Sequence, residues 1–208
     1  MRTRLSTSLI AASFIIALFG TQAHSQTIVE EWSSIKTPPA PATKPVSVNV
    51  KTAALLMLDF MEQNCGKRAR CIATEPKVKA LLTEARAKGM TVAYSLIANT
   101  TTADIRKELA PLPSEPWVRA SVDKFFNTDL EKILKERGVD TVIIVGTAAN
   151  GAVLNTATAA AVRGLNVIVP IDGMSGDPFA EQYTMWHLAN APGVSPRTTL
   201  TKIDDIKF

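Results

Sequence analysis

Hydrophobic and polar positions follow two different periodicities from residue 52 onward. Short runs that are apolar almost throughout predict buried strands at residues 53–58, 90–97, 141–145, 165–171 and 198–201. Stretches with apolar residues at helical spacing, or with helix-favouring termini, predict helices at residues 75–88, 128–137, 152–163 and 178–190. Such strands in alternation with helices indicate a parallel sheet covered on both faces. The predicted fold class is α/β, a three-layer, doubly wound and mostly parallel sheet.

Residues that favour helix ends support these boundaries. Gly89, Gly138 and Gly164 each follow a predicted helix, at the position where glycine commonly adopts the left-handed conformation that ends a helix. Thr128 and Glu131 have the spacing of a capping box, which predicts that the second helix begins near residue 128.

The first 25 residues have the organisation of a cleaved secretory signal peptide. Arg2 and Arg4 precede an apolar core at residues 9–19, and small residues come just before Gln26. We therefore expect a secreted or periplasmic protein. The apolar core is shorter than the roughly 20 residues that span a bilayer, so we expect no stable membrane insertion.

The next segment, residues 26–50, is rich in Pro, Thr, Ser and Val and predicts an extended leader outside the core. Residues 51–208 are then expected to form one domain. The chain has a formal net charge of +4, of which Arg2 and Arg4 supply two units, so the remainder carries +2. That is too weak a charge for a nucleic-acid-binding footprint.

Cysteine and histidine usage restricts the chemistry further. The chain has two cysteines, Cys65 and Cys71, and in an oxidising compartment we expect a disulfide in preference to two free thiols. If the thiols were free, Cys65 would be a candidate nucleophile. Beyond the signal segment the one histidine is His187, which excludes metal sites that need two or three imidazoles. We expect neither a metal nor another cofactor.

Polar residues at the ends of the predicted strands are the candidates for a site, because ligands of such sheets bind beyond the carboxyl ends of the strands. Asp59 follows the first strand and Asp172 the fourth, where Gly173 favours a simple turn. The segment 146–151, which contains Asn150, lies between a strand and a helix and would present backbone N–H groups to a ligand. It has neither the P-loop nor the nucleophile-elbow pattern.

The order of these segments resembles the isochorismatase-like family, also called cysteine hydrolases. The resemblance covers about residues 52–201 and rests on Leu58-Asp59, DKFFNTDL at 123–130, VIIVGTAANGAVLNTA at 142–157, RGLNV at 163–167 and Asp172. It implies an α/β hydrolase that acts on a small molecule and assembles as a homo-oligomer, with residues 203–208 docking on a partner subunit.

The resemblance also implies the catalytic residues. The family's aspartate corresponds to Asp59 and its lysine to Lys124, although a gapless register would place Arg119 there. Ala152 occupies the position of the nucleophilic cysteine, and a methyl group can neither attack nor accept a proton. The backbone amides of Ala148 and Ala152 would bind a substrate oxygen.

One branch of this family, the isochorismatases proper, hydrolyses a vinyl ether without a nucleophile. There the resemblance implies that Asp59 protonates a substrate carbon while Lys124 orients or stabilises. Phe125 or Trp117 would form an apolar wall for a planar ligand. Two alternatives stay open: a non-catalytic protein that binds a small molecule in the same pocket, and a purely structural subunit.

Overall fold

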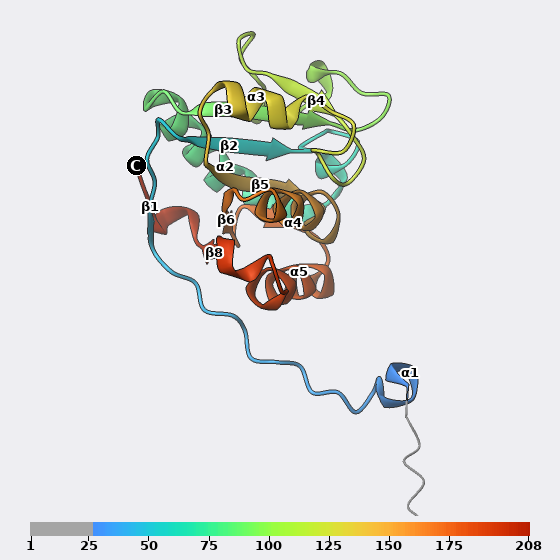
Figure 1. The fold of residues 1–208 in the computed structure, drawn as a ribbon. Coiled ribbons are helices and arrows are strands. Elements are labelled where there is room, and N and C mark those ends of the chain that lie inside the picture. Colours follow the sequence, from blue (N-terminus) through green and yellow to red (C-terminus); the bar gives the residue numbers. More distant parts are fainter. Residues whose placement is uncertain (1–26) are drawn as a thin grey trace, which may run out of the picture. The chain divides into compact units, whose positions relative to one another are not determined.

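The computed structural model describes residues 27–208, so the predicted signal peptide at residues 1–25 lies outside the described residues. The chain forms two compact units, Met1–Pro38 and Pro39–Phe208. The described part of the first unit contains one short helix, α1 (Ile28–Glu31). The second unit contains the whole α/β domain (Figure 1). None of the helices in residues 27–208 is both long and apolar enough to cross a bilayer.

A seven-stranded sheet forms the centre of the second unit, in the order β4-β3-β2-β5-β6-β8, with β7 beside the end of β5. Each strand pair of this sheet is parallel. Its strands are β2 (Ala53–Leu58), β3 (Thr91–Leu96), β4 (Trp117–Arg119), β5 (Thr141–Thr147), β6 (Asn166–Pro170), β7 (Met174–Ser175) and β8 (Thr198–Thr201). The predicted fold class is confirmed.

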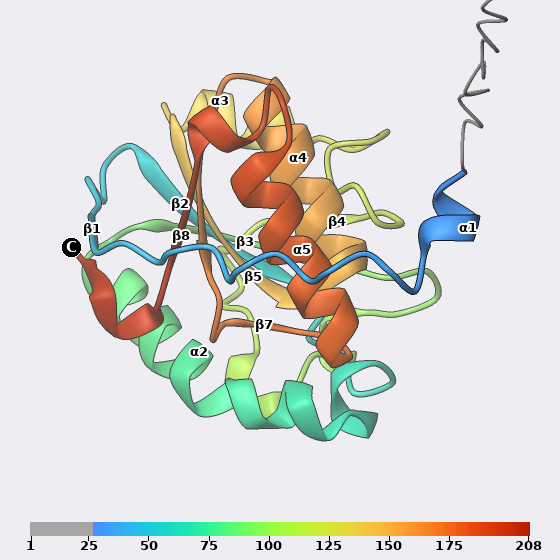
Figure 2. The ribbon, with the colours of Figure 1, turned by 90° about the horizontal axis from the view of Figure 1, so that it is seen from below.

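Helices cover both faces of this sheet. Helix α2 (Ala69–Ala87) lies on one face, and α3 (Leu130–Glu136), α4 (Leu154–Val162) and α5 (Pro178–Asn190) lie on the other (Figure 2). The buried side chains accordingly form two apolar clusters, one that includes Leu81 and Leu82 of α2 and one that includes Ala157 of α4 and Leu188 of α5. Because helices cover both faces of the sheet, a central strand such as β2 is apolar throughout, and all six of its residues are buried.

Several boundaries differ from the predicted ones for identifiable reasons. Helix α2 begins at Ala69 and continues through Pro76, which has no N–H to donate within the helix, so the sequence pattern placed its start too late. Before α4 the chain makes a π-helical turn, Ala149–Val153, so the α-helix begins at Leu154, two residues after the predicted start at residue 152. Strand β4 was not predicted because only Val118 of its three residues is buried.

The end of the predicted leader belongs to the domain, contrary to the prediction that residues 26–50 lie outside the core. Strand β1 (Val46–Ser47) pairs in parallel with β9 (Ile206–Lys207), and Val48 is buried. The backbone groups of β1 find their hydrogen-bond partners in the carboxyl-terminal segment. The Pro-rich composition of residues 26–50 gave no reason to expect this pairing. The carboxyl-terminal segment was expected to dock on a partner subunit, and the structure instead packs Ile203 and Ile206 into the core of their own chain.

The direction of strand addition reverses between β2 and β5, which places the switch point of the sheet there. From β2 the chain adds β3 and β4 on one side, then returns to add β5, β6 and β8 on the other. Ligands of open α/β sheets bind in the crevice at such a point, beyond the carboxyl ends of the strands. Here those ends carry Asp59 after β2 and Gly146-Thr147 at the end of β5.

We predict that Gly146→Ala destabilises the domain by about 3 kcal/mol, because a methyl group has no room at this junction. Gly146 has φ +155°, and a Cβ there would lie 2.4 Å from the Leu58 carbonyl oxygen. Gly138 is the matched control, since it also has a positive φ, +65°, but nothing lies within 4 Å of its Cβ position. Gly138→Ala should cost about 1 kcal/mol. Urea unfolding measures both, and equal losses would contradict the steric explanation.

Candidate functional site

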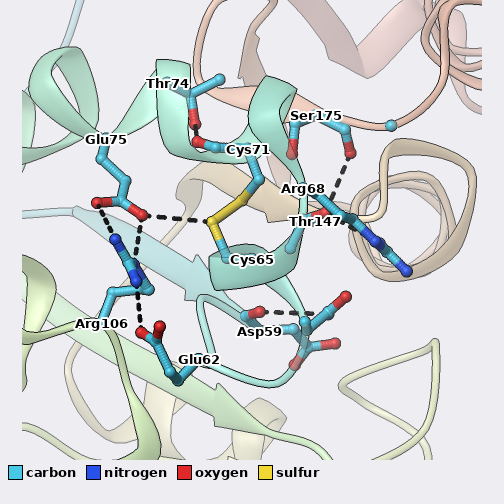
Figure 3. The surroundings of a disulfide bond; sticks show 12 residues. Asp59, Glu62, Cys65, Arg68, Cys71, Thr74, Glu75, Arg106, Thr147 and Ser175 are labelled. Carbon is cyan, nitrogen blue, oxygen red and sulfur yellow. Dashed lines mark hydrogen bonds and ion pairs between the residues drawn. A yellow bond between two sulfur atoms is a disulfide. The ribbon is translucent and has the colours of Figure 1, made fainter.

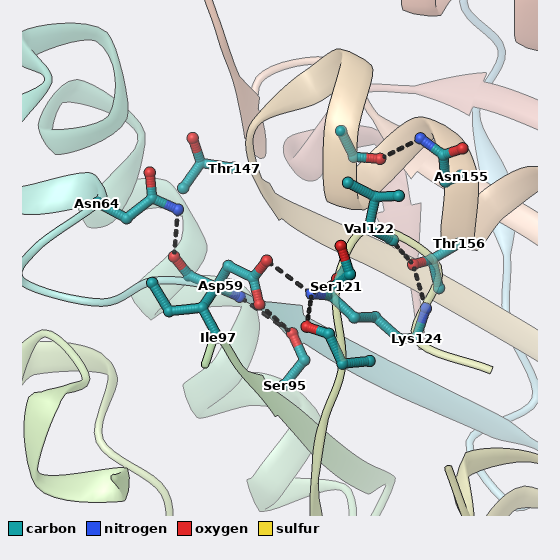
Figure 4. A network of polar contacts seen from close by, with 12 residues as sticks. Asp59, Asn64, Ser95, Ile97, Ser121, Val122, Lys124, Thr147, Asn155 and Thr156 are labelled. Atoms are coloured by element: carbon teal, nitrogen blue, oxygen red, sulfur yellow. Dashed lines mark hydrogen bonds and ion pairs between the residues drawn. The ribbon is translucent and has the colours of Figure 1, made fainter. Parts of the chain in front are cut away.

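Asp59 lies at the point where β2 ends and the chain turns away from the sheet. Its backbone is left-handed, with φ +56°, a conformation that non-glycine residues adopt uncommonly and that is found at functional sites. The side chain is almost completely buried, and the residue is only 5% exposed. The Asn64 side-chain amide donates to the Asp59 carbonyl oxygen at 3.4 Å, which helps hold the turn. The carboxyl group is therefore fixed at the carboxyl edge of the sheet (Figure 4).

Ser95 positions one oxygen of this carboxyl group. Its hydroxyl donates to Asp59 Oδ1 at 2.6 Å and accepts the Asp59 backbone N–H at 3.2 Å. Ser95 is brought there by the parallel register, in which Leu58 of β2 is the partner of Ser95 in β3. The hydroxyl fixes the orientation of the Asp59 side chain relative to its own backbone.

Lys124 binds the other carboxyl oxygen. Its Nζ lies 2.7 Å from Asp59 Oδ2, and the lysine side chain is completely buried. The ammonium also donates to the carbonyl oxygens of Ala120, at 3.3 Å, and Ser121. These contacts satisfy the three N–H donors of the group, as a buried ammonium requires. The loop before α3 is thus wrapped around the Lys124 side chain (Figure 4).

The same loop is attached to the helix after the glycine turn. The Lys124 backbone N–H donates to Thr156 Oγ1 at 3.3 Å, and that hydroxyl donates to the Val122 carbonyl oxygen at 3.3 Å. Thr156 lies one helical turn after Ala152, which is buried with 3% exposure. Asp59, Lys124 and the turn that carries Ala152 therefore gather at one edge of the sheet.

Two opposing influences act on the Asp59 carboxyl. Burial raises its pKa above the ordinary value of 3.8, whereas the neighbouring Lys124 ammonium and the hydrogen bond from Ser95 act to lower it. The net direction is upward, because removing a carboxylate from water costs more than these contacts return. The site thus favours a carboxyl group that retains its proton to higher pH than an exposed aspartate.

The turn after β5 is tightly structured. The peptide bond between Thr147 and Ala148 is cis, and the N–H groups of Gly151 and Val153 both donate to the Ala148 carbonyl oxygen, at 3.0 and 3.3 Å. Ala148 is half-buried and Asn150 is exposed. The roles expected for the Ala148 and Ala152 amides and for Asn150 stay predictions.

Of the two cations considered as the partner of Asp59, the structure brings Lys124 and not Arg119 into contact with it. Arg119 instead donates to the Thr100 carbonyl oxygen at 2.6 Å and lies over the Trp117 ring at 5.3 Å. Trp117 is the partner of Tyr94 in β3, one residue before Ser95, so it lies near the carboxyl edge of the sheet, and it is 45% exposed. Its expected role as an apolar wall stays a prediction.

Phe125 was the other expected wall residue, and its ring is directed into the core. It is 4% exposed, belongs to the apolar core that includes Leu130 and Leu134 of α3, and lies 4.8 Å beneath the Arg163 guanidinium. The sequence shows that Phe125 is apolar but not the direction in which it points. Asp172 lies in a turn, as expected, and its side chain accepts the Ile203 N–H and pairs with Lys77.

Sequence reasoning missed Ser95 and Thr156, the two hydroxyl residues that support the pair. Ser95 is a polar interruption near the end of an otherwise apolar strand, which is a signal that could have identified it. Thr156 had no comparable signal, because its contact depends on how the loop before α3 packs on α4. Both cysteines of the chain, Cys65 and Cys71, form a disulfide, as expected.

Comparisons with known proteins identify the family of the chain. The sequence profile described as the isochorismatase domain matches residues 53–200. No curated protein sequence matches the chain.

Solved structures with a similar fold include three with informative descriptions. An isochorismatase family protein from Desulfovibrio vulgaris has 22% identity and a TM-score of 0.66, over 74% of this chain and 95% of that one. N-carbamoylsarcosine amidase from Thermoplasma acidophilum has 20% identity and a TM-score of 0.63, over 74% and 97%. The nicotinamidase from Staphylococcus aureus has 21% identity and a TM-score of 0.61, over 69% and 98%. At these identities the likeness establishes the fold.

We predict that Lys124→Met lowers the free energy of unfolding at pH 7 by about 3–5 kcal/mol, because it leaves the Asp59 carboxyl buried without its cation. Asp59→Asn should also destabilise, by leaving the ammonium unpaired. The double variant should recover a large part of the summed loss, since neither charge is then left unpaired. A denaturant-based double-mutant cycle measures this coupling. Strictly additive losses would show that the two groups do not interact.

Proposed function

Because this chain belongs to the isochorismatase family, a family of hydrolases, we propose that it is an exported hydrolase that uses Asp59 as general acid and base, without a thiol nucleophile, on a small molecule. The observation that carries the proposal is the buried ion pair of Asp59 and Lys124 at the switch point of the sheet. A buried titratable group with a raised pKa at that position is typical of a catalytic acid.

The absence of a thiol nucleophile is supported by the distribution of the cysteines. The chain contains two, and they are bonded to one another, 1.99 Å apart at Sγ. The family resemblance assigns the position of the nucleophile to Ala152, which lies in the turn after β5. A sulfur in a disulfide is not a thiolate, so it cannot attack a carbonyl carbon as a nucleophile. We therefore assign the chemistry to the carboxyl group.

In the proposed reaction the Asp59 carboxyl donates its proton to the double-bonded carbon of a vinyl ether. The adjacent carbon becomes an oxocarbenium ion, and the developing positive charge is balanced by the Asp59 carboxylate that remains. Water adds to the cation and returns one proton to Asp59, and the resulting hemiketal separates into a carbonyl compound and an alcohol. Lys124 holds the carboxylate in place throughout, and Ser95 fixes its orientation.

Export and self-association are parts of the same proposal. The disulfide supports export, because such bonds persist in oxidising compartments. The exposed face of α5 supports a homo-oligomer, since Phe179, Tyr183 and Trp186 are 66%, 43% and 43% exposed. Aromatic side chains exposed together on one helix are typical of interaction surfaces.

We expect Asp59→Asn to abolish turnover, because the amide cannot exchange the proton. Hydrolysis would be followed by mass spectrometry on a panel of small vinyl ethers and amides. Treating the native protein with iodoacetamide should leave turnover intact, since both sulfurs are bonded. Loss of activity after alkylation would contradict the thiol-free mechanism.

The proposal also predicts the pH dependence. Asp59 must be protonated to act as an acid, so kcat/KM should fall as the pH rises through its pKa, which burial places above 3.8. Lys124→Met removes an influence that lowers this pKa, so any residual activity should persist to higher pH. Asp172→Asn is the matched control, because Asp172 lies in the turn after a strand but pairs with Lys77, and it should leave the profile unchanged. A profile that rises with pH in this window would contradict the role of Asp59 as an acid.

The same panel of vinyl ethers and amides distinguishes hydrolysis from the alternative function, binding without catalysis. A ligand that raises the melting temperature of the protein but forms no product would support that alternative.

A further inference from the structure

Arg68 is an exposed cation beside the site that the proposed chemistry does not use. Its Nη1 lies 3.5 Å from the hydroxyl oxygen of Thr147, the last residue of β5. Leu58 and Gly146 are partners in the β2–β5 register, so Thr147 stands opposite Asp59 at the same edge of the sheet. The Arg68 side chain therefore extends over the edge where Asp59 lies (Figure 3).

Two nearby cations on α2 have acidic partners. Arg70 pairs with Glu181, and Lys77 pairs with both Asp172 and Asp204. Within residues 27–208 Arg68 forms no ion pair, and its one side-chain hydrogen bond is with the Thr147 hydroxyl. A cation at this position is also unfavourable for the helix, because Arg68 is the N-cap of α2 and the amino end of a helix is partially positive. Helix stability therefore does not explain Arg68.

The disulfide holds this arginine in place. Arg68 is the residue at which the 3-10 turn Cys65–Lys67 ends and α2 begins, and its backbone is extended, with φ −125° and ψ 107°. The two bonded cysteines lie on either side of it in the sequence and are both completely buried. An exposed side chain on a doubly anchored backbone loses less conformational freedom on binding a ligand than one on a free loop.

We propose that Arg68 binds a carboxylate group of the substrate, so that the substrates are small carboxylic acids. This inference rests on the proposed function and deepens it by naming the substrate class. A guanidinium offers paired N–H donors that match the two oxygens of a carboxylate. The Lys124 ammonium is completely buried, and its donors are taken by Asp59 and two carbonyl oxygens, so it is not available to a ligand. One guanidinium at this edge therefore matches a monoanion better than a phosphate dianion.

The test measures binding, not turnover, with two pairs of probes that differ only in charge: succinamate with succinamide, and benzoate with benzamide. Isothermal titration calorimetry in 50 mM salt gives the dissociation constant of each probe. We expect the native protein to bind each carboxylate at least tenfold more tightly than its amide partner. Arg68→Gln should remove this preference while leaving the affinity for the amides unchanged.

Two further variants make the result specific to the guanidinium. Lys67→Gln removes a neighbouring exposed charge from the same loop and should leave the preference intact. Arg68→Lys keeps the charge but loses the paired donors, and should retain only part of the preference. The double variant Cys65→Ala/Cys71→Ala should weaken carboxylate binding at least threefold, because it frees the backbone that carries Arg68.

The proposal is overturned if the native protein shows no preference for the carboxylates, or if Arg68→Gln and Lys67→Gln lower it equally. An unchanged preference in the cysteine double variant would overturn the part assigned to the disulfide. Because these readouts do not involve product, they are independent of the proposed hydrolysis. A carboxylate preference without turnover of any compound would contradict the hydrolase and leave Arg68 as a binding residue.

Discussion

The architecture of the site depends on the removal of one carboxylate and one ammonium from water. Asp59 and Lys124 come from segments 65 residues apart in sequence, and both are buried with their charged atoms 2.7 Å apart. Neither group would be tolerated in this position alone, because an unpaired buried charge costs several kcal/mol. The pair therefore requires β2, the loop before α3 and the amino end of α4 to pack in one arrangement.

Much of the fold follows from the sequence pattern because its strands are buried on both faces. An apolar run such as 53–58 has few alternatives to a buried strand in a chain of this length. The elements β2, β8 and α5 have the predicted bounds. Asp59 was identifiable because it follows such a strand, and a carboxyl group at the end of a buried apolar strand needs a partner or a function. The disulfide was predictable from the number of cysteines and the expected compartment.

Other features depend on tertiary contacts that no local pattern encodes. The hydroxyl of Ser95 acquires its role only through the register that pairs it with Leu58. Strand β1 forms because β9 offers it backbone partners from the other end of the chain. Phe125 was expected to form an apolar wall for a planar ligand, yet its ring packs beneath Arg163.

The proposed mechanism requires Asp59 to retain a proton beside the Lys124 ammonium. Burial favours this, because it raises the pKa of the carboxyl group. The most direct measurement is a titration of the Asp59 carboxyl carbon by NMR in protein labelled with ¹³C-aspartate, with Asp59→Asn used to assign the signal. We predict a midpoint above the ordinary 3.8. A midpoint at or below that value would show that the ion pair outweighs burial, and it would contradict the assignment of Asp59 as the acid.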